Sequence, residues 1–140
     1  MISNSSSKIR VLLAKIGLDG HDRGAYIVSK ILRKAGMEVI FMGRYQSAEM
    51  VARAAIHEDV SVIAISDHCG VMVDIVKDVI NETKKLNAEN IAIVVGGLIA
   101  EKDIPVLKKM GVTGCFAAGS SHKEIVNHIQ EVALKRTESN

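Results

Sequence analysis

The sequence predicts a doubly wound α/β domain with one parallel sheet of five strands in the order 2-1-3-4-5. Short apolar segments alternate along the chain with segments whose apolar residues recur at helical spacing. Strict alternation of strand and helix produces a parallel sheet with right-handed crossovers. The 140 residues are 48% hydrophobic but only 3% aromatic, so the core must be aliphatic, as in strands buried on both faces. Together these observations indicate a single flavodoxin-like domain.

Five segments are predicted as strands because each is a short aliphatic run bounded by polar residues or glycine. They are Lys8–Leu13, Met37–Met42, Ser61–Ser66, Ile91–Val95 and Val112–Phe116. Gly96 and Gly97 directly follow the fourth run and are expected to end that strand.

Five helices are predicted between and after these strands. They are Arg23–Ala35, Ser47–His57, Val71–Leu86, Asp103–Met110 and Ser121–Lys135. Ser47 is a candidate N-cap, and Ser120 or Ser121 is a candidate cap of the last helix. Gly36 and Gly111 are positioned to end two helices, and Pro105 is tolerated within a first helical turn.

The domain is expected to span residues 8–135, with a disordered lead over 1–7 and a flexible tail over 136–140. The net charge is +2 and the charges are scattered, which argues against a nucleic-acid partner. No apolar run approaches about 18 residues, so no membrane partner is expected. Without a secretory signal, Cys69 and Cys115 are expected to be reduced thiols in the cytoplasm.

The loop after the first strand is the first place to look for a site, because ligands of this fold bind outside the carboxyl ends of the strands. Residues 17–24 form a long loop for this position, and it carries Asp19 and His21. The carboxylate can accept one imidazole N–H while the other ring nitrogen binds a metal. A plain helix cap at Asp19 with an exposed His21 would fit the same residues. A zinc site is a poor alternative, since no second ligand has suitable spacing. The glycines match neither the dinucleotide nor the P-loop pattern.

Asp19-Gly20-His21-Asp22-Arg23-Gly24 resembles the Asp-x-His-x-x-Gly motif of cobalamin-binding domains. Forty-one residues separate Gly24 from Ser66, and twenty-seven separate His68 from the Gly96-Gly97 pair. These resemble the serine and the glycine pair that the family has after its third and fourth strands. The resemblance covers Lys8 to Val132 and is greatest with the acyl-CoA mutase branch, of which methylmalonyl-CoA mutase is an example.

This resemblance implies that His21 is the metal ligand: it replaces the cofactor's own benzimidazole as the lower axial ligand of cobalt. Asp19 is implied to be the hydrogen-bond partner of His21. The displaced nucleotide tail would enter a slot between the sheet and its flanking helices. Gly24 would let the first helix begin close to that tail, and the Ser66 hydroxyl would bond the buried base.

The resemblance implies further cofactor-binding residues at the last two strands. Gly96 and Gly97 would let the backbone approach the tail, because no side chain intervenes. Ala118-Gly119-Ser120 is similar to a Pro-Gly-Thr stretch of the mutases, so Gly119 and Ser120 are expected near the nucleotide phosphate or ribose. No residue of this chain is assigned a catalytic role.

Asp67 and His68 depart from the family pattern, which usually has serine and then leucine or threonine at these positions. The expectation is that His68 hydrogen-bonds the tail, or that Asp67 and His68 contact a partner chain. Ser66, Asp67 and His68 are consecutive, so their side chains point in different directions and do not form a catalytic triad.

The resemblance predicts an isomerase that uses adenosylcobalamin to rearrange the carbon skeleton of an acyl-CoA. The family's substrate domain is a TIM barrel, which needs about 250 residues and cannot fit in this chain. The expected protein is therefore the cofactor-binding small subunit of a two-subunit acyl-CoA mutase, inactive without a larger TIM-barrel subunit that binds the acyl-CoA.

Two alternatives belong to other functional classes. A corrinoid carrier for methyl transfer shares all three motifs but usually has a helical domain before the first strand, where this chain has about eight residues. A signalling receiver needs an acidic cluster after the first strand and an aspartate ending the third. This sequence has Ala14-Lys15 and Ser66 at those places.

Overall fold

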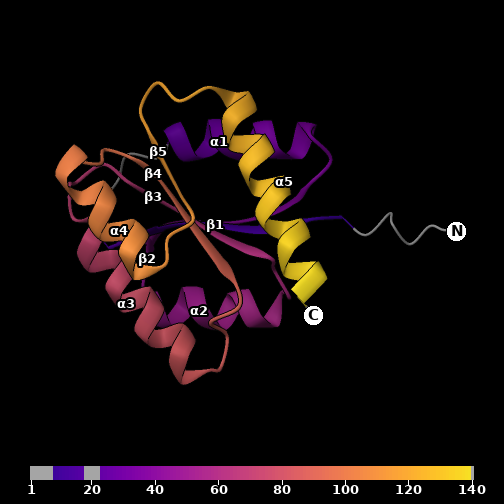
Figure 1. Ribbon diagram of the computed structural model, residues 1–140, viewed down its shortest axis with the longest axis horizontal. Coiled ribbons are helices and arrows are strands. Elements are labelled where there is room, and N and C mark those ends of the chain that lie inside the picture. Colours follow the sequence, from indigo (N-terminus) through magenta and orange to yellow (C-terminus); the bar gives the residue numbers. More distant parts are fainter. Residues whose placement is uncertain (1–7, 18–22, 140) are drawn as a thin grey trace, which may run out of the picture.

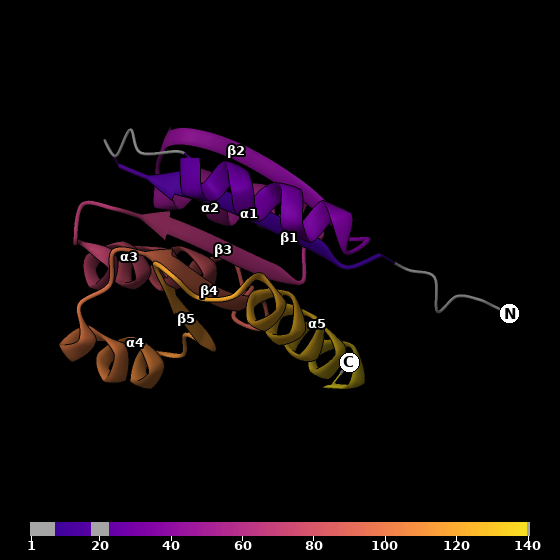
Figure 2. The ribbon, with the colours of Figure 1, turned by 90° about the horizontal axis from the view of Figure 1, so that it is seen from above.

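The computed structural model describes residues 8–17 and 23–139, and its single sheet confirms the predicted topology. The strands are β1 (Arg10–Ile16), β2 (Glu38–Gln46), β3 (Val62–Asp67), β4 (Ala92–Gly97) and β5 (Gly114–Ala117). All pair in parallel in the order β2-β1-β3-β4-β5. Figure 2 shows this succession from β2 at one edge to β5 at the other.

Helices cover both faces of the sheet (Figure 1). They are α1 (Arg23–Lys34), α2 (Ala48–His57), α3 (Met72–Lys85), α4 (Ile104–Met110) and α5 (His122–Ser139), and a short 3₁₀ turn, η2 (Glu101–Asp103), precedes α4. Helices α1 and α5 lie on one face, and α2, α3 and α4 lie on the other. The flavodoxin-like, doubly wound arrangement is therefore confirmed.

The core consists of two aliphatic layers, one on each face of the sheet. Successive residues of β1 alternate between them: Val11 and Leu13 pack under α1 and α5, whereas Leu12 and Ala14 pack under α2 and α3. Residues 11–14 are all buried. This period of two explains why each strand is a continuous apolar run rather than an alternating one.

The helices begin and end close to the capping residues that the sequence predicts. The Ser47 Oγ accepts a hydrogen bond from the Met50 amide at 3.1 Å, which confirms the N-cap of α2. Gly111 ends α4 in the left-handed conformation, and Pro105 lies in the first turn of that helix. The cap of α5 is Ser121, whose Oγ accepts from the Glu124 amide at 3.1 Å. Ser120 instead donates its hydroxyl to the Ala117 carbonyl at 2.8 Å.

Several predicted boundaries are wrong, and most errors are at strand ends. β1 continues to Ile16, β3 continues past Ser66 to Asp67, and Gly96 and Gly97 belong to β4. The ladder between β3 and β4 extends to Asp67 opposite Gly97, because backbone pairing does not require apolar side chains. At the other end of the chain α5 reaches Ser139, so most of the predicted tail is helical.

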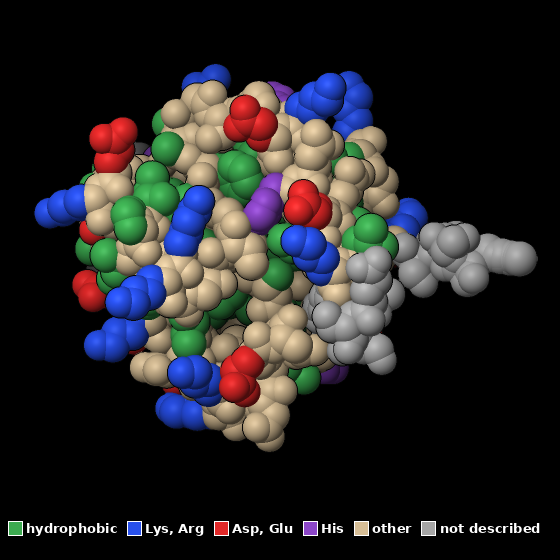
Figure 3. Space-filling view, viewed as in Figure 1, with side chains coloured by type: hydrophobic (Ala, Val, Ile, Leu, Met, Phe, Trp, Pro, Cys, Tyr) green, Lys and Arg blue, Asp and Glu red, His purple; other side chains and the backbone are tan. Residues whose placement is uncertain are grey.

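Charged side chains of both signs are interspersed on the face shown in Figure 3, as the scattered sequence charges predict. Within the described residues, no helix has the length and apolar character needed to cross a membrane. The cytoplasmic location and the lack of a nucleic-acid or membrane partner stay predictions.

Candidate cofactor site

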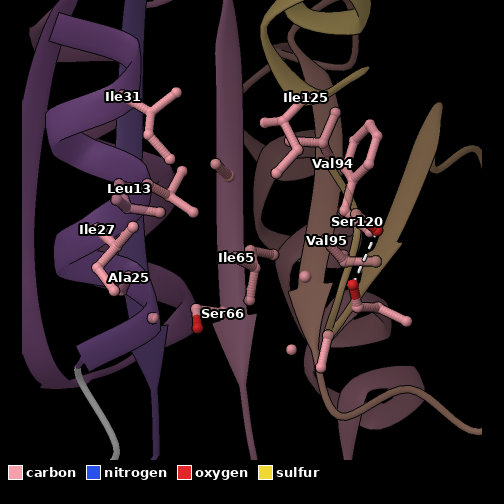
Figure 4. Close-up of a pocket in the computed structure, with 18 of the residues that line it drawn as sticks. Leu13, Ala25, Ile27, Ile31, Ile65, Ser66, Val94, Val95, Ser120 and Ile125 are labelled. Atoms are coloured by element: carbon pink, nitrogen blue, oxygen red, sulfur yellow. Dashed lines mark hydrogen bonds between the residues drawn. The ribbon is translucent and has the colours of Figure 1, made fainter. Parts of the chain in front are cut away.

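A slot opens between the sheet and the two helices α1 and α5, with a cavity volume of about 240 Å³. Ile27 and Ile31 of α1 form one wall and Ile125 of α5 lies across from them (Figure 4). The strands contribute mostly aliphatic side chains to the floor, so the interior of the slot is apolar. Its volume is below the range of about 300–1,000 Å³ that encloses a whole small molecule. The slot therefore suits one apolar portion of a larger ligand.

The structure brings six of the predicted cofactor residues to this slot. They are Gly24, Ser66, Gly96, Gly97, Gly119 and Ser120. These residues come from α1, from the ends of β3 and β4, and from the turn between β5 and α5. They meet because the carboxyl ends of parallel strands lie at one edge of the sheet. Asp19 and His21, including the predicted metal ligand, lie outside the described residues.

Ser66 is buried at the end of β3, and a buried lysine lies next to it. Lys15 of β1 is 0% exposed, and its Nζ donates to the Ser66 Oγ at 3.4 Å. A lysine ammonium has three donors and no acceptor, so Ser66 must accept this hydrogen bond. The single hydroxyl hydrogen of Ser66 is consequently available for an acceptor in the slot. Lys15 was not predicted as a site residue, although a lysine within an otherwise apolar strand is the signal that could have identified it.

Gly97 has a structural reason to be glycine that the sequence did not reveal. Its φ is +113°, and a Cβ atom there would overlap the carbonyl oxygen of Asp67 on the paired strand. At Gly96 a Cβ would come within 3.2 Å of the Phe116 carbonyl oxygen. The packing of β3 against β4 is therefore sufficient to explain Gly97, whatever the slot contains.

Asp67 holds the loop that follows β3. It is 1% exposed, and its two carboxylate oxygens accept hydrogen bonds from the amides of Cys69 at 3.2 Å and Val71 at 3.0 Å. An aspartate does end the third strand, contrary to the expectation that Ser66 would. This carboxylate is occupied within its own loop and buried, unlike the accessible aspartate that a signalling receiver requires. Asp67 is equally unsuited to the predicted contact with a partner chain.

His68 lines the slot beside Ser66. A Cβ atom at Gly24 would lie 3.5 Å from the His68 Cε1 and 3.7 Å from its Nε2, so the imidazole packs over the first turn of α1. The contact of His68 with a cofactor tail stays a prediction.

Burial shifts the pKa values of Cys115 in β5 and of His128 in α5. Burial raises the pKa of the Cys115 thiol, against a smaller opposing effect of Lys108. Burial also lowers the pKa of His128, whose Nε2 lies 3.0 Å from the Thr113 hydroxyl. A thiol with a raised pKa is a weaker nucleophile at neutral pH. In residues 8–17 and 23–139 no three metal-ligating side chains cluster together.

The fold and the slot define a doubly wound domain with an apolar cavity at the carboxyl edge of its sheet, where ligands of this fold class bind. Residues 9–126 match the family described as B12 binding domain, and the chain belongs to this family.

Two relatives are similar over nearly their whole length. The 2-hydroxyisobutanoyl-CoA mutase small subunit of Aquincola tertiaricarbonis is 35% identical, over 91% of this chain and 94% of the relative. The pivalyl-CoA mutase small subunit of Xanthobacter autotrophicus is 38% identical, over 96% and 90%. Methylmalonyl-CoA mutase of Escherichia coli is 28% identical over 93% of this chain, which corresponds to 19% of that protein.

Solved structures confirm the fold. A cobalamin-binding protein from Desulfitobacterium hafniense has a TM-score of 0.77 at 17% identity, covering 89% of this chain and 59% of that one. The monomethylamine corrinoid protein of Methanosarcina barkeri has a TM-score of 0.73 at 16% identity, covering 92% and 60%. The chemotaxis protein CheY4 of Vibrio cholerae has a TM-score of 0.64 at 19% identity, covering 90% and 99%. The same fold thus occurs in different functional classes, and the slot must carry the functional argument.

Proposed function

We propose that this chain is the cobalamin-binding small subunit of a two-subunit, adenosylcobalamin-dependent acyl-CoA mutase. The observation that carries the proposal is the 35–38% identity to two mutase small subunits over at least 90% of both chains. The slot supports the same function, since its apolar interior and polar mouth match a nucleotide tail with an apolar heterocycle.

Within this proposal, His21 is the lower ligand of cobalt and Asp19 is its hydrogen-bond partner. The benzimidazole of the tail lies among aliphatic side chains of the slot. Ser66 donates its hydroxyl hydrogen to a nitrogen of that ring, because Lys15 already occupies a lone pair of the serine oxygen. When bound, the cofactor supplies the radical chemistry, and the residues of this chain hold and orient it.

The second subunit is proposed to be a TIM-barrel protein that binds the acyl-CoA. Tyr45 lies at the carboxyl end of β2, whereas Val71 and Leu98 come after β3 and β4; their side chains are 56%, 45% and 57% exposed. Large apolar side chains exposed around a cofactor edge favour a protein partner there. A partner over this edge would also exclude water from the reacting groups, which suppresses side reactions.

The test is turnover by the purified chain with adenosylcobalamin and candidate acyl-CoAs, with and without the barrel protein from the same source. Rearranged product is expected only when both proteins are present, since a single domain has no enclosed substrate cavity. Turnover by this chain alone would refute the two-subunit proposal. Methyl transfer from methylcobalamin without any rearrangement would favour the corrinoid carrier.

The proposed ligation by His21 has its own spectroscopic test. Labelling histidine nitrogen with ¹⁵N should change the hyperfine splitting of bound cob(II)alamin, because the nuclear spin of the ligating nitrogen changes. His21→Ala should abolish this dependence on the label and leave weaker binding through the slot. A splitting that ignores the label in the parent protein would show that cobalt has another lower ligand.

A further inference from the structure

The imidazole of His128 in α5 packs directly onto the backbone of the outer strand β5. A Cβ atom at Gly114 would lie 2.7 Å from the His128 Nε2 and 2.8 Å from its Cδ2, so the ring fills the space that a side chain would take. The His128 Nε2 also lies 3.0 Å from the hydroxyl oxygen of Thr113, the residue before the strand. The imidazole is thus held to β5 by a close contact and by a hydrogen bond.

Phe116 shares this space above Gly114. The rings of Phe116 and His128 meet edge to face, with centroids 5.4 Å apart and ring planes at 66°. This is a favoured arrangement for two aromatic rings. A Cβ atom at Gly114 would also lie 2.9 Å from the Phe116 Cε2, so a larger residue at this position would have to displace one or both rings. The absence of a side chain at Gly114 therefore allows the two rings to contact each other.

Phe116 is also part of the slot. The residues of β5 alternate between the faces of the sheet: Cys115 packs with the layer under α2, α3 and α4, and Phe116 packs with the layer under α1 and α5. Phe116, Ile125 and Ile129 line the slot together, whereas His128 contacts the Phe116 ring from outside the lining. His128 therefore acts on a ligand in the slot through the position of Phe116.

The surroundings of His128 favour its neutral form. Burial lowers the pKa of His128, and Lys108 on α4 and Lys135 on α5 act in the same direction. Glu131, one turn later on α5, has the opposite effect, but its carboxylate also lies 3.5 Å from the Lys135 Nζ. A histidine whose pKa is lowered by folding contributes stability above its ordinary pKa of about 6.5 and loses that contribution as the pH falls. The packing of His128 onto β5 should therefore weaken in mild acid.

We infer that His128 is a positioning residue that holds Phe116 in the wall of the slot, so that binding of the cofactor's nucleotide tail weakens in mild acid. This inference rests on the proposed function, in which the slot receives that tail. A wall side chain that is fixed before binding loses little conformational entropy when the ligand arrives. When its imidazole support is removed or protonated, Phe116 gains freedom, and the tail loses affinity while the corrin ring does not.

The experiment measures dissociation constants for adenosylcobalamin and for adenosylcobinamide, which lacks the nucleotide tail, between about pH 5.5 and 7.5. At the upper pH, His128→Ala should weaken cobalamin binding about 2- to 10-fold, the equivalent of one aromatic contact. Binding of cobinamide should be unchanged, which also shows that the variant is folded. His128→Phe keeps an aromatic ring against Phe116 and cannot be protonated, so it should retain the affinity of the parent. As the pH falls, the preference for cobalamin over cobinamide should shrink in the parent but not in His128→Phe.

Comparison of the parent with His128→Phe removes other sources of pH dependence, because titration of His21 or of the cofactor affects both proteins alike. His57→Leu is the matched control, since His57 is exposed on α2 at the opposite face of the sheet, and it should keep the parent's pH profile. Identical profiles for the parent and His128→Phe, or an equal loss of both ligands in His128→Ala, would overturn the inference while leaving the proposed function intact. A parent that binds no cobalamin would refute the proposed function as well.

Discussion

Gly97 shows how one residue can satisfy a family motif and a packing requirement together. The resemblance assigns this glycine to the approach of a nucleotide tail. The structure adds that the β3–β4 pairing leaves no room for a Cβ atom beside the Asp67 carbonyl. A single sequence cannot separate these causes, because both require the same residue.

Substitution of two glycines separates backbone strain from steric overlap. Gly97→Ala should lower the free energy of unfolding by more than about 1 kcal/mol, because the alanine is strained at positive φ and overlaps Asp67. Gly119→Ala is the matched control: its φ is +94°, but a Cβ there meets no atom within 4 Å. Urea unfolding without cofactor should therefore show the smaller loss at Gly119. Equal losses of unfolding free energy in the two variants would mean that backbone strain alone destabilises both.

Lys15 and Asp67 are two residues whose contacts cannot be inferred by interpreting the sequence one residue at a time. Both are charged side chains that the fold buries, at 0% and 1% exposed. The partners of both depend on the fold, because Lys15 contacts a residue 51 positions away and Asp67 accepts hydrogen bonds from main-chain amides whose orientation depends on the loop.

At the scale of elements, helices were predicted more accurately than strands. Helix termini carry chemical signals, such as Ser47 before α2 and Gly111 after α4, because terminal amides and carbonyls need partners. Strand ends carry weaker signals. The ladders continue to Gln46, Asp67 and Gly97 because a neighbouring strand is present, a condition set elsewhere in the chain.

The cap of α2 provides a test at this scale. Ser47→Ala should reduce the free energy of unfolding by about 0.5–2 kcal/mol, since the Met50 amide loses its acceptor. Urea unfolding of the chain would measure the loss. Asn90→Ala, at an exposed position between α3 and β4, should be nearly neutral. A Ser47→Ala protein as stable as the parent would show that water replaces the cap without cost.

At the scale of the whole molecule, the slot results from the order of the strands. Because β1 and β3 are adjacent, α1 and α5 cover one face and leave the slot between them, above strands from both halves of the chain. Gly24 and Ser120 are far apart in sequence but border one cavity. The proposed partner would cover the edge where this cavity opens.

The sequence by itself determined the fold class, the strand order, the family and six of the residues that line the slot. Periodicity, helix caps and short motifs are local properties. Each can be recognised in the sequence without knowing which other segments pack against it. The tertiary structure decided which of those residues share a cavity, how deeply Lys15 is buried and where the His68 ring faces. These depend on contacts between distant segments, whose geometry arises only when the two aliphatic layers pack against the sheet.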